Sequence, residues 1–233
     1  MHKSRRSSNG GAAQRREPLS RERVVAAALG LVDAEGVDAL TMRRLARELG
    51  CNAMALYRYA ASRDALLDGV VETVMAQLVI TPDGPDWEGQ LRRTAHDFRS
   101  LVLAHPKVVP LLVTRPLSTP LGLRPLGTLR PLEMILALLV DAGFSPRDAL
   151  HVYRAYFGFV YGHVLTELQE VVTNPEESDD LLRLGLHRLP PREFPHLRRL
   201  ASELADYDGA AELDQGLDIL LTGLRGQLRP RAR

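Results

Sequence analysis

Cysteine is nearly absent from this sequence, and long apolar runs are missing. Cys51 is the only cysteine among 233 residues, so an internal disulfide is excluded and a reducing compartment is favoured. No apolar stretch approaches the ~18 residues that a membrane span needs, and the N-terminal segment lacks the apolar core of a signal peptide. We therefore expect a cytoplasmic protein with no membrane partner.

The motifs of enzymes and metal centres are missing as well. The seven histidines show neither the His-x-x-x-His spacing nor the Cys/His spacing of metal sites. The sequence contains no Gly-rich phosphate loop, no Gly-x-Ser-x-Gly motif and no acidic pair in a context that indicates acid–base catalysis. We predict no catalytic residues, no metal ligands and no cofactor, and we do not expect an enzyme.

The formal net charge of +1 conceals an uneven distribution of charge along the chain. Residues 1–63 carry twelve Lys or Arg and six Asp or Glu, a net of +6, while the remaining residues carry eighteen and twenty-three, a net of −5. A basic N-terminal part is expected to approach a polyanion such as DNA. Because Lys3 and Lys107 are the only lysines, arginine is available for bidentate contacts to phosphate or guanine, although a GC-rich coding sequence would explain the same preference.

Residues 41–64, TMRRLARELGCNAMALYRYAASRD, predict a helix-turn-helix. Apolar residues at helical spacing indicate a first short helix, and Gly50 permits the positive φ at which that helix ends. Ala46 is small, as two helices that cross steeply through a short turn require at their closest approach. Asn52 is placed to cap the second helix, and Leu56 anchors it.

The outer face of this motif supplies the candidate DNA contacts. We expect Ala53 and Met54 to meet thymine methyl groups, Tyr57 to donate its hydroxyl to a phosphate, and Arg58 to read guanine. Arg63 is expected to hold the DNA backbone; the alternative for the charged residues is a solvated helix face, and for Tyr57 a ring that belongs mainly to the core. The full set of predicted DNA-binding residues is Arg43, Arg44, Asn52, Ala53, Met54, Tyr57, Arg58, Tyr59 and Arg63.

Three parts follow from the patterns around the motif. Residues 1–17 are rich in Ser, Gly and Arg and predict a disordered basic arm, which either lies along DNA or remains a solvated tail. Residues 18–66 predict a DNA-binding domain whose first helix runs from a cap at Ser20 to Gly36. Residues 67–233 predict a ligand-binding and dimerisation domain, connected by a fourth helix that Ser62 caps and that ends at the Pro/Gly-rich segment 81–85.

The remainder of the chain keeps a helical pattern, so we predict an all-α fold. We expect helices at 87–105, 132–140, 194–204 and 213–228, and a long helix that opens at Ser145-Pro146-Arg147-Asp148. The proline-rich region 106–131 predicts short helices and loops, and the acidic segment 173–191 predicts a mobile loop.

Residues 19–67 resemble the TetR family of transcriptional regulators. The resemblance rests on DAEG at 33–36, LTMRRLARELG at 40–50, LYRY at 56–59 and RDALL at 63–67. It implies a homodimer whose two heads read an inverted repeat in double-stranded DNA, and whose bodies bind a small-molecule effector that releases the DNA; repression also follows from this resemblance. The family often has His-Phe in place of Tyr59-Ala60, and Lys in place of Arg63.

The body resembles the tetracycline-repressor branch at TRP, 114–116, and GFSPRD, 143–148. Val79 and Leu111 stand where that branch would place its drug-binding and magnesium-binding histidines, so tetracycline itself is not expected. The aromatic content of the body favours a mostly apolar ligand, planar or polyketide-like, although helical aromatics are also ordinary core residues. The candidate ligand-binding residues are His96, His105, Leu112, Arg115, Tyr153, Tyr156, Phe157 and Tyr161.

Dimerisation is assigned to two helical seams that would form a four-helix bundle across a two-fold axis. Gly158 and Gly162 lie one turn apart and permit a close helix approach. The final helix contributes Leu217, Leu220 and Leu224. The alternative for both seams is that they belong to the intramolecular core. For the function, the alternative is a ligand-independent DNA-binding regulator.

Overall fold

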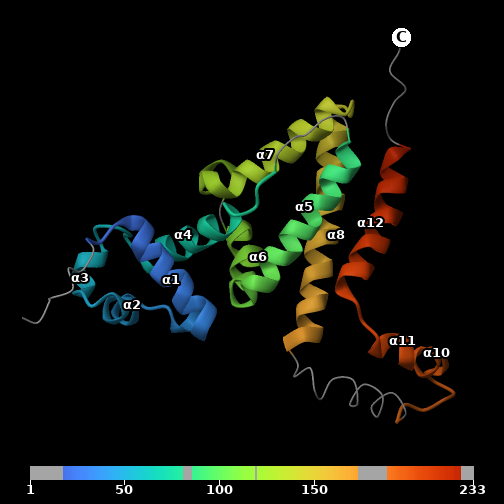
Figure 1. The fold of residues 1–233 in the computed structure, drawn as a ribbon, viewed down its shortest axis with the longest axis horizontal. Helices are drawn as coiled ribbons and strands as arrows, with labels where there is room; N and C mark the ends of the chain where they lie inside the picture. The colour runs from blue at the N-terminus through green and yellow to red at the C-terminus, as the bar shows by residue number, and fades with distance from the viewer. Residues whose placement is uncertain (1–17, 81–85, 119, 173–187, 227–233) are drawn as a thin grey trace, which may run out of the picture.

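The computed structural model describes residues 18–80, 86–118, 120–172 and 188–226, and the regular secondary structure of these residues is helical throughout. Figure 1 shows a head of short helices that α4 joins to a body of longer ones. The predicted all-α fold is therefore confirmed. The predicted arm 1–17 and most of the predicted loop 173–191 lie outside the described residues. Within the described residues, no helix combines the length and apolar character needed to cross a bilayer.

The head contains the predicted helix-turn-helix. It consists of α1 (Arg21–Glu35), a 3-10 turn η1 (Val37–Ala39), α2 (Met42–Leu49) and α3 (Ala53–Leu56). Gly50 ends α2 in the left-handed conformation, with φ 62° and ψ 37°, which costs least for a residue without a Cβ. Ala46 is buried beside this turn, and its carbonyl accepts from the Cys51 N–H at 2.9 Å. The two helices are thus joined by a short turn in which Gly50 is left-handed and Cys51 bonds back to Ala46.

Side-chain caps start the helices of the head where the sequence predicts them. Ser20 accepts from the Arg23 N–H at 3.2 Å, and Thr41 accepts from the Arg44 N–H at 3.1 Å. The Asn52 carboxamide oxygen accepts from the Met54 N–H at 2.9 Å. Each bond satisfies a backbone donor that a helix start leaves unpaired, so these caps fix the boundaries of α1, α2 and α3.

Helix α4 (Arg63–Met75) connects the head to the body. Ser62 caps it through the Ala65 N–H at 3.1 Å, and buried residues lie on most of its circumference because it packs against α1 on one side and against α6 and α7 on the other. Gly69 lets α1 approach closely, since a Cβ there would lie 2.9 Å from a methyl group of Val25. One rigid helix therefore contacts both parts of the chain.

The body surrounds the long helix α8 (Pro146–Val172). Its other helices are α5 (Trp87–Ala104), η2 (Pro106–Val108), α6 (Val109–Ser118), η3 (Leu121–Leu123), α7 (Leu126–Asp141), α10 (Pro195–Arg199), α11 (Ala201–Ala205) and α12 (Gly209–Arg225). Helix α8 packs against α5, α7 and α12. A partly buried ion pair joins α5 to α8, with Arg99 Nε donating to the buried Glu167 at Oε2, 2.8 Å away.

Two predicted helices differ in the structure. Helix α7 begins at Leu126 rather than at residue 132 and continues through Pro131, although proline lacks the N–H that would bond to the carbonyl four residues earlier. Pro131 is buried among neighbouring helices, so tertiary packing outweighs the missing hydrogen bond. The predicted helix 194–204 is two short helices, α10 and α11, because the backbone of Leu200 between them departs from helical geometry, with φ −93° and ψ 17°.

Candidate nucleic-acid interface and ligand cavity

The predicted DNA-reading side chains lie on α2, on α3 and on the residues directly after α3. Arg43 and Arg58 are exposed, Met54 is 73% exposed and Tyr57 is 48% exposed. A methionine so open to water on a helix of the head has no packing role within the protomer, so its apolar side chain is available to a partner. Ala53 and Tyr59 are only partly exposed and pack against the core, which limits what they present to DNA.

The structure gives Arg44 and Arg63 intramolecular partners. Arg44 donates to Glu35 Oε1 at 2.6 Å and to Glu48 Oε2 at 2.9 Å, which ties α2 to the end of α1. Arg63 Nε donates to the Leu40 carbonyl at 2.7 Å, and Nη2 donates to the Val37 carbonyl at 2.8 Å. Arg63 was predicted to hold the DNA backbone, but in this structure it holds the backbone of the head on α4.

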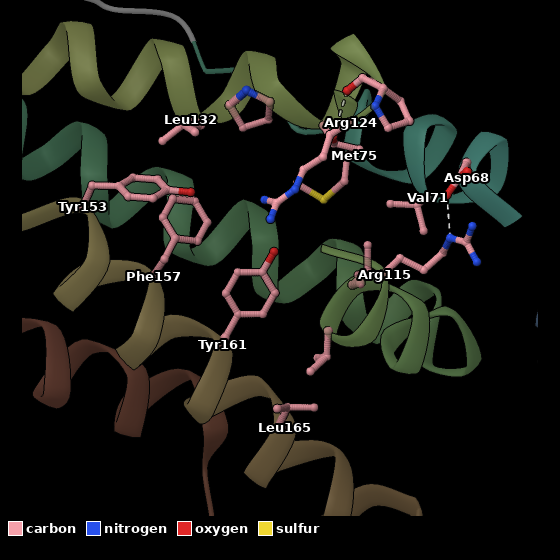
Figure 2. A pocket seen from close by; sticks show the side chains of 15 residues that line it. Asp68, Val71, Met75, Arg115, Arg124, Leu132, Tyr153, Phe157, Tyr161 and Leu165 are labelled. Carbon is pink, nitrogen blue, oxygen red and sulfur yellow. Dashed lines mark hydrogen bonds and ion pairs between the residues drawn. The ribbon is translucent and has the colours of Figure 1, made fainter. Parts of the chain in front are cut away.

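A cavity of about 310 Å³ lies in the body between α4, α6, α7 and α8 (Figure 2). Its wall is mostly apolar or aromatic, with a few charged groups. The lining residues are Asp68, Val71, Met75, Leu112, Val113, Arg115, Arg124, Pro125, Thr128, Pro131, Leu132, Tyr153, Phe157, Tyr161 and Leu165. A concave, largely apolar site with a few polar groups is typical of small-molecule binding.

Five of the eight predicted ligand-binding residues line this cavity. Leu112 and Arg115 come from α6, and three aromatic residues come from α8. Tyr153, Phe157 and Tyr161 follow one another at four-residue steps, which places them on one face of the helix. Their ring centroids lie 4.7 Å apart for the first pair and 5.7 Å for the second, so they form one continuous aromatic surface.

His96, His105 and Tyr156 were predicted in the pocket, and the structure places them elsewhere. His96 lies 2.8 Å from Asp214 and joins α5 to α12. His105, between α5 and η2, lies 2.9 Å from Asp33 and so joins this part of the body to α1 of the head. Tyr156 is 1% exposed and donates its hydroxyl to the Leu91 carbonyl at 2.7 Å. All three connect helices of the protomer, and Tyr156 faces α5 because it is one residue off the aromatic row.

Helices α4 and α7 supply lining residues that the sequence did not single out. Asp68, Val71 and Met75 come from α4, while Arg124 and Thr128 flank the start of α7. Helix α4 was interpreted only as a connector, and its residues 68, 71 and 75 share a helical face that could have indicated a second use. Arg124 lies in the proline-rich region, where the sequence has no helical periodicity that could predict which residues face the cavity. Val79 and Leu111, the positions of the expected drug ligands, lie outside the lining.

Two ion pairs of Arg115 link the cavity wall to the first turns of α4. Arg115 Nε donates to Asp68 Oδ1 at 2.5 Å, and Nη1 donates to Asp64 Oδ1 at 3.2 Å. The hydrogen bond to Asp68 raises the pKa of Arg115. On the aromatic wall, burial raises the pKa of Tyr161 to about 12, so its hydroxyl stays neutral at physiological pH. No group of three or more His, Cys, Asp or Glu side chains in the described ranges is arranged to hold a metal ion.

The predicted dimerisation residues divide into two sets. Gly158 and Gly162 are exposed on α8, and a Cβ at either would meet nothing within 4 Å. Leu217 is 0% exposed and Leu224 is 6% exposed, so these two leucines belong to the core of the protomer, and the prediction that they form a dimer seam is wrong. Leu220 is partly exposed, and Ile219, which was not predicted, is 78% exposed. Helix α12 uses one face for the core, and its other face holds the residues open to a partner.

Comparison with known proteins identifies the family. Residues 24–70 match the model for bacterial regulatory proteins of the tetR family, and residues 81–228 match the tetracyclin repressor-like C-terminal domain. An HTH-type transcriptional regulator of Saccharopolyspora erythraea is 30% identical over 88% of this chain and 84% of its own. The tetracycline repressor protein class C of Escherichia coli is 30% identical over 88% of this chain and 90% of its own.

Solved structures of the same family share the fold. ActR of Streptomyces coelicolor, solved in complex with actinorhodin, is 31% identical, with a TM-score of 0.76 over 91% of this chain and 100% of that one. A family match that spans the head and most of the body agrees with the helix-turn-helix and the helical body described above. The chain therefore belongs to the TetR family of DNA-binding transcriptional regulators, which are not enzymes.

Proposed function

We propose that this protein is a ligand-responsive repressor in the cytoplasm, which binds an inverted-repeat operator as a homodimer and leaves it when a small, mostly apolar molecule fills the cavity. In this proposal residues 18–66 read DNA, residues 67–233 bind ligand and dimerise, and the arm 1–17 adds basic charge. The observation that carries the proposal is that α4 lines the cavity through Val71 and Met75 and also supports the head.

The contacts of α4 explain how a ligand in the cavity would affect the DNA-binding head. At its start, Arg63 bonds to the Val37 and Leu40 carbonyls of the head. Slightly further along, Asp68 bonds to Arg115 of the cavity wall. Glu72 accepts from the Gly127 N–H at the start of α7 at 3.3 Å, and this close contact depends on glycine, because a Cβ would lie 2.6 Å from Glu72 Cγ. A ligand that displaces α6 or α7 would therefore displace α4, and the head with it.

The relatives support the nature of the effector. ActR has been solved with actinorhodin, and a TetR variant of Acinetobacter baumannii has been solved with minocycline. These two ligands agree with a fused-ring effector that lies on the aromatic wall of the cavity. We do not propose tetracycline itself, since Val79 and Leu111 supply no metal ligand where the resemblance expects one.

Dimerisation is proposed through the exposed faces of α8 and α12, with Gly158, Gly162 and Leu220 in the interface. Two heads would then contact half-sites about one DNA turn, roughly 34–36 Å, apart. Such a spacing demands one relative orientation of the two protomers, so a ligand that favours another orientation weakens binding.

The test uses fluorescence anisotropy with a labelled duplex from the promoter adjoining the gene. At near-physiological salt we expect the inverted repeat to be preferred over a random duplex, and added fused-ring ligands to release it. DNA binding that no such ligand releases would favour the alternative, a ligand-independent regulator. Equal affinity for the inverted repeat and random DNA would contradict both.

A further inference from the structure

Two tyrosine side chains of α8 carry hydroxyl groups into the ligand cavity. Tyr153 and Tyr161 both line it, about two helical turns apart on one face of the helix, and the ring of Phe157 contacts both of theirs (Figure 2). Within residues 18–80, 86–118, 120–172 and 188–226, neither hydroxyl forms a hydrogen bond with another group of the protein. The polar atoms of the aromatic wall are therefore directed at whatever occupies the cavity.

Other hydroxyls near the cavity are satisfied inside the protomer. Tyr156 lies on the same helix, and its hydroxyl donates to the Leu91 carbonyl at 2.7 Å. Thr128 lines the cavity, and its hydroxyl donates to the Pro125 carbonyl at 2.7 Å. Each of these hydroxyls takes a carbonyl oxygen as its acceptor, so we expect the two phenols of the wall to take an equivalent oxygen from a ligand.

A ligand that fills the cavity displaces water from both phenols. A hydroxyl that loses water and gains no acceptor weakens binding, because its hydrogen bond is not replaced. A ligand oxygen within reach of the hydroxyl restores that bond. A site with such polar groups discriminates strongly against an analogue that lacks the matching atom.

Both phenols are hydrogen-bond donors at neutral pH. Burial raises the pKa of Tyr153 and raises that of Tyr161 to about 12, and the nearby charge of Arg124 opposes both shifts without reversing them. A neutral phenol has one proton to donate, and the lone pairs of a carbonyl oxygen accept it. A carbonyl group on the edge of a ring system adds such an acceptor and keeps the molecule planar and uncharged.

We propose that Tyr153 and Tyr161 determine the specificity of this cavity, because their hydroxyls select fused-ring molecules with ring carbonyl oxygens over hydrocarbons of the same shape. The effector then belongs to the aromatic ketones or quinones, and Phe157 contributes only apolar contact with its rings. This inference rests on the proposed function, in which the cavity is the effector site.

The test measures binding to the full-length protein by equilibrium dialysis, with 9-fluorenone against fluorene and xanthone against xanthene. Within each pair the ring frame is the same, and a methylene group replaces the carbonyl. The variants are Tyr153→Phe, Tyr161→Phe and the double variant, which remove hydroxyls and keep the rings. Tyr156→Phe is the matched control, because this hydroxyl lies on the same helix but outside the cavity lining. The melting temperature and the operator affinity without ligand establish that each variant is folded.

We expect at least one single variant to weaken a ketone by about 3- to 10-fold, the effect of one neutral hydrogen bond. The matching hydrocarbon should bind that variant as tightly as the wild type or more tightly, because it no longer leaves a hydroxyl without an acceptor. The double variant should lose at least as much ketone affinity as the more affected single variant. Tyr156→Phe should leave the ratio of ketone to hydrocarbon affinity unchanged.

The outcomes separate this inference from the proposed function. Ketones that do not bind, or a ratio of ketone to hydrocarbon affinity that is the same in the wild type and the double variant, would overturn the inference. If fused-ring molecules nevertheless released the operator, the proposed function would stand without it. A ketone that needs these hydroxyls for binding but does not release the operator would support the inference and contradict the proposed function.

Discussion

Replacing Arg63 by methionine tests whether this side chain supports the head or touches DNA. In the structure its guanidinium donates to the Leu40 and Val37 carbonyls at 2.7 and 2.8 Å, across the joint between α4 and the head. A hydrogen bond with a charged donor contributes about 1.5–3 kcal/mol, and partial exposure to water reduces that value. We expect the free energy of unfolding to fall by about 2–4 kcal/mol and the melting temperature by roughly 5–15 °C.

The assay combines urea unfolding with operator binding at several salt concentrations. A lost phosphate contact lowers the slope of log affinity against log salt by about 1, because fewer counterions are released. Arg63→Met should leave that slope unchanged, since its role in this structure is within the protein. DNA affinity itself should fall, because the head is less firmly held on α4 when these two hydrogen bonds are lost.

Arg43→Met is the matched control for this experiment. Arg43 is exposed on α2, so its loss should lower the salt slope by about 1 and leave the free energy of unfolding within about 0.5 kcal/mol of the wild type. If Arg63→Met behaved like this control, with unchanged stability and a reduced slope, then Arg63 would be a phosphate contact and the intramolecular role inferred here would be wrong.

Three further predictions follow from the head, the proposed dimer and the cavity. Arg58→Ala should relax operator preference at one base pair at a cost of about 1–3 kcal/mol, whereas equal weakening on all duplexes would make Arg58 a phosphate contact. Gly162→Leu should shift the protein to monomer in light scattering, while Gly30→Leu, at another helical glycine with open space around it, should not; a dimeric Gly162→Leu would remove α8 from the interface. Tyr161 has a pKa of about 12 in the folded protein and about 10 in the unfolded chain, so between these values only the unfolded chain loses the proton. The free energy of unfolding should therefore be unaffected by this group below pH 10 and should fall by about 2 kcal/mol as the pH rises to 12. Urea unfolding of the wild type and of Tyr161→Phe at pH 9 and pH 11 checks this, because the free energy of unfolding should fall less between the two pH values in the variant, which has no phenol at residue 161.

The head could be predicted closely because its boundaries are local. Ser20, Thr41 and Asn52 each cap the helix that follows, and each cap uses a side chain and a backbone N–H two or three residues apart. The left-handed residue at the turn, Gly50, is equally local. Helix caps and turn glycines depend only on residues a few positions apart, so they can be recognised in the sequence without knowing the tertiary packing.

The body was less predictable because its features depend on which helices meet. The spacing of Leu217 and Leu224 predicts a buried face, but burial against the same protomer and burial against a partner give the same pattern. His96 and His105 lie near aromatic residues in the sequence, yet they face acidic residues 118 and 72 positions away. Arg124 had no signal at all, because a residue outside regular periodicity gains its role only when α4, α7 and α8 enclose it.

The magnitude of the switch indicates what must move in the cavity. Changing a 99:1 population to 1:99 requires about 5.5 kcal/mol of differential ligand affinity. The ion pairs of Arg115 do not reach this, since the side chains of Asp64 and Asp68 are 76% and 38% exposed and such pairs contribute about 0–1 kcal/mol each. At about 25 cal/mol per Å² of apolar area, the difference corresponds to roughly 220 Å², or about 110 Å² for each cavity of a dimer. In the proposed mechanism, apolar packing of the ligand against the cavity wall, which includes Val71 and Met75 of α4, would supply energy on this scale, and Arg115 would transmit the displacement rather than drive it.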